Sequence, residues 1–180
     1  MIVGDRVSLR AIEMDDLGLL VKWRNDPHVA EHFYEKEPLS LEMQKRWFDG
    51  FLSRGSKEKY FIIEDNKDGR PVGTISVYSI DWRSRHAEFG RFFLADESTR
   101  GKGYGKEALG LLLDFCFGQL NLNKIYGDTQ FDNKAAIGLY ESMGFVREGM
   151  KRSHVFRKGE YIDIVALSIL TSEWRVKNRT

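Results

Sequence analysis

Apolar and polar residues repeat along the chain with two different spacings, which predict strands and helices. Alternation with a period of two predicts strands, and a spacing of three and four residues predicts amphipathic helices. The predicted strands cover residues 6–12, 60–64, 72–80, 87–94, 124–131, 145–156 and 161–170. The predicted helices follow Asp15-Asp16, Ser40, Gly105 and Asn133. The resulting order, βααβββαβαββ, predicts an α/β protein with a mixed sheet and helices on its faces.

Two of the predicted helices carry a clear apolar stripe. The helix after Gly105 presents Leu109, Leu112, Leu113 and Cys116 at positions i, i+3, i+4 and i+7, which predicts a buried face. The helix after Ser40 is supported by three further apolar residues at i, i+4 and i+8, namely Met43, Trp47 and Phe51.

Composition narrows the class of protein further. With 180 residues and no linker or repeat, the chain is expected to form a single domain over residues 1–180. Its 28 basic and 27 acidic residues argue against a general nucleic-acid binder. No apolar run approaches the roughly 18 residues that span a bilayer, and the first residues lack a signal-peptide pattern. A lone cysteine, Cys116, excludes an internal disulfide. We therefore expect a soluble cytoplasmic domain.

Three interpretations compete for the glycine loop RGKGYG at 100–105. A nucleotide P-loop requires a hydroxyl residue after its lysine, but Glu107 follows Lys106, so this interpretation fails. A dinucleotide-binding fingerprint fits Gly103, Gly105 and Ala108, but too few residues follow to complete a doubly wound domain. A third possibility is a pyrophosphate cradle, in which backbone N–H groups and the positive end of a helix bind a diphosphate. An ordinary strand-to-helix loop stays open on the loop alone.

A second segment, NKAAIGLYESMGF at 133–145, follows the loop helix after one strand. Together the two segments resemble the GNAT family of N-acetyltransferases, whose cofactor loop reads [QR]-x-x-G-x-[GA] and whose later segment reads N-x-x-A-x-x-L-Y…G-F. The resemblance extends from Arg6 to about Leu170. It implies the GNAT fold, a mixed and mostly antiparallel sheet of about seven strands with helices on both faces. It also implies acetyl-CoA as the acetyl donor.

The resemblance assigns residues to the reaction. It implies that the pantetheine arm of acetyl-CoA pairs with Phe92, Phe93 and Leu94, with a register that could slip by one or two positions. It places the phosphates on the loop residues Arg100, Gly101, Lys102, Gly103, Tyr104, Gly105 and Lys106. Asn133 is implied in a pantetheine contact, although it is equally suited to cap a helix. Tyr140 is implied as the proton donor to the departing thiolate, against the alternative of a core residue. Glu88 is the candidate base, against the alternative of an ion pair with Arg85, Arg91 or His86.

The acceptor is an amine, but its identity stays open. Within the family the chain resembles spermidine, ribosomal-protein N-terminal and amino-sugar-nucleotide acetyltransferases. Acidic residues at 31, 35, 37 and 42 favour a cationic polyamine, while Arg152, Arg157 and Lys158 favour an anionic acceptor. A non-catalytic CoA-binding regulatory module is the alternative function.

Three expectations concern partners. No metal is expected, because the pair His28 and His32 lacks the acidic residue of a zinc helix. We expect a homodimer, with the aromatic residues Trp23, Phe33, Tyr34 and Trp47 as its candidate patch. No nucleic acid or membrane partner is expected.

Overall fold

The computed structural model of the protein describes residues 1–31, 33 and 37–177. Within these residues the strands are β1 (Ile2–Val3), β2 (Val7–Ala11), β3 (Lys59–Asp65), β4 (Pro71–Asp81), β5 (His86–Leu94), β6 (Lys124–Gln130), β7 (Val146–Arg157) and β8 (Glu160–Leu170). The α-helices are α1 (Leu17–Asn25), α2 (Pro27–Ala30), α3 (Leu41–Arg54), α4 (Tyr104–Asp114), α5 (Lys134–Ser142) and α6 (Thr171–Lys177). No helix in this part of the chain combines the length and the apolar character needed to cross a membrane.

The strands form one sheet in the order β1-β2-β3-β4-β5-β6-β8-β7. All neighbouring strands are antiparallel except β5 and β6, which pair in parallel. Each predicted strand is present, so the mixed and mostly antiparallel sheet is confirmed. The prediction missed β1, α2 and α6, because elements of two, four and seven residues are too short to show a periodic pattern.

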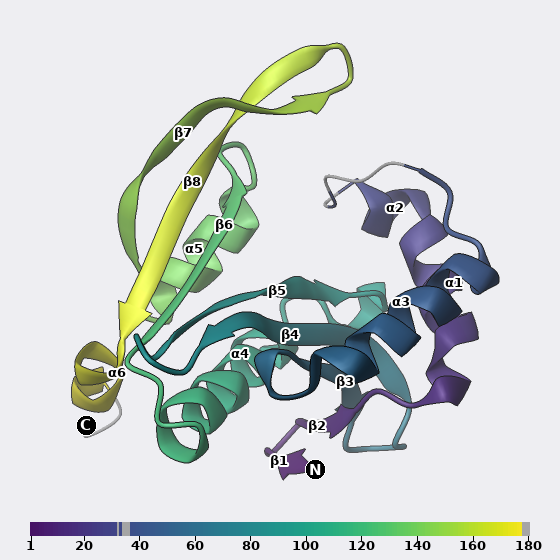
Figure 1. Ribbon diagram of the computed structural model, residues 1–180, viewed down its shortest axis with the longest axis horizontal. Coiled ribbons are helices and arrows are strands. Elements are labelled where there is room, and N and C mark those ends of the chain that lie inside the picture. The colour runs from purple at the N-terminus through teal and green to yellow at the C-terminus, as the bar shows by residue number, and fades with distance from the viewer. Residues whose placement is uncertain (32, 34–36, 178–180) are drawn as a thin grey trace.

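Helices cover both faces of the sheet, as predicted. Along β3, Ile63 belongs to the large core that contains Leu109 of α4, while its neighbour Ile62 belongs to a smaller core that contains Leu20 of α1 and Phe48 of α3. Successive side chains of a strand point to opposite faces, so α4 and the pair α1 and α3 lie on opposite sides of the sheet (Figure 1).

The two helices with predicted apolar stripes differ in which of those residues are buried. The buried face predicted for the helix after Gly105 is confirmed, because Leu109, Leu112 and Leu113 of α4 and Cys116 of the π-helical segment Phe115–Gln119 that continues it are each 0% exposed. The helix predicted from Met43, Trp47 and Phe51 is confirmed as α3, in which Phe48 is buried, Trp47 and Phe51 pack at the margin of the small core, and Met43 is 44% exposed. Gln44 occupies the buried position one turn before Phe48.

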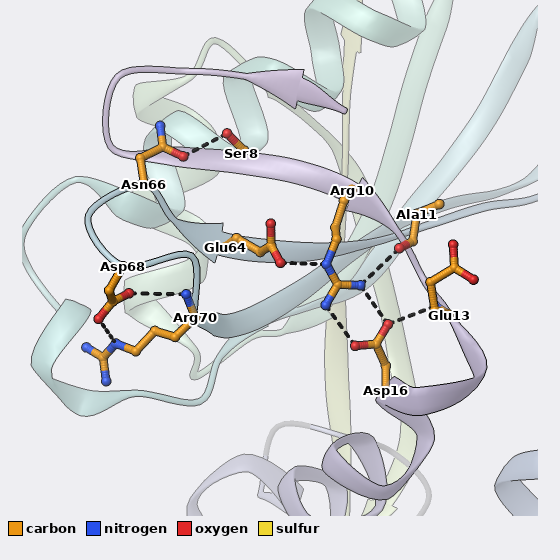
Figure 2. A network of polar contacts seen from close by, with 9 residues as sticks. All are labelled: Ser8, Arg10, Ala11, Glu13, Asp16, Glu64, Asn66, Asp68 and Arg70. Carbon is orange, nitrogen blue, oxygen red and sulfur yellow. Dashed lines mark hydrogen bonds and ion pairs between the residues drawn. The ribbon is translucent and has the colours of Figure 1, made fainter.

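A polar network attaches the start of α1 to the sheet (Figure 2). Arg10 of β2 donates to both carboxylate oxygens of Asp16, at 2.7 and 2.8 Å, and to Glu64 of β3 at 2.6 Å. Asp16 also accepts from the backbone N–H of Glu13 at 2.8 Å. Burial alone would raise the pKa of Asp16, but the hydrogen bonds from Arg10 and Glu13 outweigh it and lower that pKa. The network therefore positions α1, which leads into one wall of the site described below.

Candidate active site

The candidate site lies where β5 and β6 separate. The two strands pair only at three positions, ending with Glu88 opposite Tyr126, and diverge beyond this point (Figure 1). A cavity of about 960 Å³ lies between them. The ring of Phe89 lies against Gly127, where a Cβ atom would approach it to 2.5 Å, so glycine is required at this position. The divergence leaves one edge of β5 without a strand partner.

A β-bulge turns the backbone of β5 inside the cavity. Arg91 has a φ of 46°, and the pairing with β4 steps from Gly90 opposite Ser76 to Phe93 opposite Thr74. Two buried hydroxyls hold the bulge: Thr74 donates to the carbonyl of Arg91 at 2.6 Å, and Ser76 donates to the carbonyl of Gly90 at 2.9 Å. The backbone after the bulge can therefore receive an extended ligand as an added strand.

The glycine loop presents unpaired N–H groups to the same cavity. Gly101 and Gly103 have φ values of 71° and 86°, which favour glycine. The intrahelical ladder of α4 begins with the N–H of Glu107 donating to the carbonyl of Gly103 at 3.0 Å. The first N–H groups of α4 therefore have no intrahelical acceptor, and the helix dipole favours an anion at this end.

The structure brings nearly all of the predicted cofactor residues to one cavity. Its wall includes Phe92, Phe93, Leu94, Arg100, Gly101, Gly103, Tyr104, Gly105, Lys106, Asn133 and Tyr140. Lys102 is the exception: it lines an adjoining hollow of about 420 Å³ near the N-terminus. The phenol of Tyr104 points away, donating to buried Asp65 of β3 at 2.9 Å, so this residue offers the cavity its backbone. Arg100 pairs with Glu97 at 3.4 Å.

Tyr140 lies on α5 at the inner end of the cavity. The residue is 7% exposed, and its ring packs edge-on against Phe89 with centroids 5.0 Å apart. Its hydroxyl has no hydrogen bond to any residue in the described ranges, although it reaches the cavity. Burial first, and the charge of Asp128 second, raise the pKa of Tyr140, which keeps the phenol protonated at neutral pH. A protonated phenol at this position can act as a proton donor.

Asn133 caps α5, as the sequence allowed. Its side-chain oxygen accepts from the N–H of Ala136 at 3.1 Å, so the amide oxygen serves the helix. The residue also lines the cavity, so both roles proposed for it are compatible with its position.

Glu88 also faces the cavity, and its carboxylate accepts from the hydroxyl of Tyr78 at 3.0 Å. The alternative ion pairs are not formed. Arg91 pairs with buried Glu58, the side chain of Arg85 donates to Asn121, and His86 lies 3.8 Å from Asp81.

The polar residues of the cavity that sequence analysis missed as site residues include Tyr78, Asp128 and Gln130. Asp128 and Gln130 stand two apart on β6, so they share a face of that strand. Asp128 binds Lys151 of β7 at 2.7 Å. The available signal was the alternation of polar side chains along β6, in which Asp128 and Gln130 continue the face that begins with Lys124 and Tyr126.

Several charged residues of the two segments named as acceptor determinants already have ion-pair partners. Glu31 lies 3.4 Å from Lys158 of the β7–β8 turn, and Arg157 pairs with Asp132. Glu42 pairs with Arg46 at 3.4 Å on α3. The net charge of either segment therefore says little about the acceptor. Glu35, His32 and Tyr34, which entered the charge, metal and dimer predictions, lie outside the described residues.

The aromatic residues predicted to form a dimer patch pack mostly inward. Trp23 and Phe33 contact Phe93 edge-on, with centroids 5.9 and 5.5 Å apart. Trp47 contacts Tyr60 at 5.2 Å. These three side chains are already half-buried within a single copy of the protein, where they contribute to the cavity wall and to the small core.

Comparison with known proteins identifies the family. Residues 6–146 match the family described as Acetyltransferase (GNAT) domain. The chain belongs to this family. It is therefore an acyltransferase that uses acetyl-CoA, which decides against the dinucleotide-binding and non-catalytic interpretations.

Several relatives cover nearly the whole chain. A spermidine N(1)-acetyltransferase of Vibrio cholerae serotype O1 is 29% identical over 172 residues, covering 96% of this chain and 97% of the relative. The spermidine N(1)-acetyltransferase of Escherichia coli K12 is 28% identical, covering 97% and 91%. The crystal structure of the Vibrio cholerae spermidine N-acetyltransferase in complex with CoA and spermine matches with a TM-score of 0.87 and 29% identity, covering 96% of this chain and 99% of that one.

Proposed function

We propose that this GNAT enzyme transfers the acetyl group of acetyl-CoA to a primary amine of a polyamine. The observation that carries the proposal is the Glu88 carboxylate in the cavity that also holds the predicted cofactor residues, together with Asp128 on the β6 wall, whose charge is shared with Lys151. Carboxylates favour a cationic acceptor by direct electrostatic attraction. The similarity to two spermidine acetyltransferases over almost the whole chain supports the same acceptor class.

Acetyl-CoA binding is assigned to the loop and to β5. The first N–H groups of α4, at Tyr104, Gly105 and Lys106, suit the diphosphate. The bulged edge of β5 at Phe92–Leu94 suits the pantetheine arm, which would pair with it as a strand does. This arrangement directs the thioester toward the inner end of the cavity, where Tyr140 lies.

The acceptor amine must lose a proton before it attacks. An alkyl amine with a pKa near about 10.4 is less than about 0.1% neutral at pH 7. Glu88 is proposed to take this proton, directly or through a water molecule. Tyr78 donates to the Glu88 carboxylate at 3.0 Å and so orients it. Burial and the charge of Glu88 raise the pKa of Tyr78, which keeps it in this donor role.

Transfer then proceeds by direct attack. The amine nitrogen forms a bond to the thioester carbonyl carbon, and a backbone N–H of β5 after the bulge stabilises the oxyanion. The carbon–sulfur bond breaks as the intermediate collapses, and the leaving thiolate receives the phenol proton of Tyr140. The nitrogen of the intermediate loses its remaining extra proton, which reprotonates the tyrosinate directly or through water, and Glu88 releases the proton taken from the ammonium to solvent, so the enzyme is regenerated.

The proposed homodimer and the cytoplasmic location rest on sequence reasoning. Strand β7 leaves residues 146–154 exposed at the edge of the sheet, which offers a homodimer a surface. Sedimentation at micromolar concentration checks the dimer: a monomer alone would contradict it.

An amine panel tests the proposed function. Purified protein is incubated with labelled acetyl-CoA and spermidine, spermine, an amino-sugar nucleotide or a peptide with a free N-terminus. The proposal predicts that the polyamines are acetylated most efficiently by kcat/KM. Preference for the nucleotide or the peptide would overturn the acceptor class.

A variant pair tests the contribution of Asp128. Asp128→Asn is expected to raise the KM for spermidine by about 5- to 30-fold, corresponding to the loss of about 1–2 kcal/mol of attraction. Asp49→Asn, an exposed carboxylate of α3 outside the cavity, serves as the control. Equal KM values in the two variants would remove Asp128 from the acceptor site.

A further inference from the structure

A buried amide group in the cavity wall lacks a partner. Gln130, the last residue of β6, is 4% exposed and lines the cavity. Its side-chain nitrogen, Nε2, has no hydrogen-bond partner within the described part of the chain. Leaving a buried donor unpaired is costly, so such a group in a ligand cavity indicates a partner on the ligand.

The orientation of this amide is set by Arg157. The guanidinium of Arg157 donates to the Gln130 side-chain oxygen, and the same guanidinium pairs with Asp132. Arginine has donors and no acceptor, so it can bind only the oxygen of the amide. The Gln130 oxygen must therefore face Arg157, which leaves Nε2 directed elsewhere. Binding of the oxygen by a cation also polarises the amide and strengthens its N–H groups as donors.

The chemistry of Nε2 selects the kind of group it can bind. A primary amide nitrogen donates two hydrogen bonds and accepts none. The ammonium groups of a polyamine also only donate, so they cannot satisfy Nε2. The pantetheine arm of acetyl-CoA carries two amide carbonyls, which are strong neutral acceptors.

The position of Gln130 agrees with this partner. Gln130 lies beyond the last paired position of β5 and β6, toward the end of the cavity away from Glu88 and Tyr126. Asn133, which the family resemblance implies in a pantetheine contact, follows three residues later and lines the same wall. Its amide oxygen is already used to cap α5.

We propose that Gln130, oriented by Arg157, donates a hydrogen bond from Nε2 to an amide carbonyl of the pantetheine arm of the acyl donor. Gln130 is then a binding residue for acetyl-CoA, and Arg157 is a positioning residue that acts through it. Because Arg157 ends β7, the Asp132–Arg157–Gln130 chain connects the β7–β8 hairpin to acyl-donor binding. The inference rests on the use of acetyl-CoA and is independent of which amine is acetylated.

Calorimetry with Gln130→Met tests the inference, because methionine keeps the length of the side chain and removes its N–H groups. We expect the Kd for CoA to rise by about 5- to 30-fold, the effect of losing one hydrogen bond with the carbonyl left buried. Adenosine 3′,5′-bisphosphate, which has phosphates but no pantetheine arm, should bind both proteins equally. Gln44→Met, a similarly buried glutamine of α3 outside the cavity, is the matched control.

The outcomes separate the possible partners. A raised KM for the amine with an unchanged Kd for CoA would place Gln130 in the acceptor site and overturn the proposal. An unchanged Kd and unchanged KM would also overturn it. Because CoA binding is measured without any amine, failure of the polyamine assay leaves this test valid.

A spectroscopic measurement on the unmodified protein covers the case in which Gln130→Met does not fold. The side-chain NH₂ signals of Gln130 are followed by nitrogen-15 NMR during titration with each ligand. The proposal predicts a shift with CoA and none with adenosine 3′,5′-bisphosphate. A shift with spermidine alone would contradict it.

Discussion

Replacing Tyr140 by phenylalanine separates a proton donor from a residue that only fills the core. The substitution removes one oxygen atom and keeps the ring. That ring packs against Phe89 and Phe145, with centroids 5.0 and 5.8 Å away, and neither contact involves the hydroxyl. The change therefore tests the hydroxyl alone.

The structure gives the size of the effect expected from each role. The Tyr140 hydroxyl has no hydrogen bond to any residue within the described ranges, so its removal should change the free energy of unfolding by less than about 0.5 kcal/mol. Loss of a general acid should lower kcat by about 10²–10⁴-fold, or about 3–5 kcal/mol in the activation barrier. The raised pKa of Tyr140 means that the phenol is in its donating form across the neutral range.

Three measurements on Tyr140→Phe decide between the roles. Acetyl transfer under saturating substrates gives kcat, calorimetry gives the Kd for acetyl-CoA, and chemical denaturation gives stability. We expect a large fall in kcat with the other two nearly unchanged. Tyr161→Phe is the control, because Tyr161 of β8 is 69% exposed and does not line the cavity. A folded Tyr140→Phe protein with normal kcat would refute the donor role.

Three further predictions concern the loop, the sheet and the cysteine. Gly103→Asp should weaken acetyl-CoA binding by at least about a hundredfold in calorimetry, because it places a carboxylate beside the diphosphate. Gly69→Asp controls for backbone strain, because Gly69 is a turn glycine away from the cavity with a similarly positive φ of 71°. Equal binding of acetyl-CoA by both variants would refute the loop assignment. Asp16→Asn should lower stability by about 2 kcal/mol at pH 7, since it removes charge-assisted hydrogen bonds from Arg10. The pKa of Asp16 is lower in the folded than in the unfolded protein, so its carboxylate contributes stability above the unfolded pKa of about 3.9. This stability is lost as the pH falls through the folded pKa, so the denaturation curves of the two proteins should converge below about pH 4. A constant difference in stability down to about pH 2 would contradict this. Burial raises the pKa of the Cys116 thiol to about 12, so a thiol reagent should label it only after denaturation, and rapid labelling of native protein would show that α4 does not bury it.

Periodicity predicted the elements that bury one continuous face. Strand β5 and helix α4 carry apolar residues at regular spacing, and their burial follows that spacing, whereas residues 146–154 of β7 are exposed. For α3 the spacing of Met43, Trp47 and Phe51 indicated a helix, but it did not identify Phe48 as the residue buried against β3, because that depends on tertiary packing.

The site was predicted as far as local motifs reach. Glycines with positive φ and an unpaired helix start are local features, so the loop was a candidate from its residues, and the family resemblance supplied its predicted role in cofactor binding. The bulge at Arg91 is held by Thr74 and Ser76 of another strand, which no local pattern reveals. Likewise, the role inferred for Gln130 depends on its hydrogen bond from Arg157, which is distant in the sequence. Residues whose role depends on contacts between strands therefore could not be predicted from the sequence.

Mass spectrometry of the products formed from acetyl-CoA and spermidine tests the central claim most directly. The account predicts spermidine carrying one acetyl group, with release of one CoA per acetylated amine. It further predicts that this product depends on Tyr140 and Glu88. Absence of acetylated spermidine above the enzyme-free background, in a protein that binds acetyl-CoA, would contradict the proposed function.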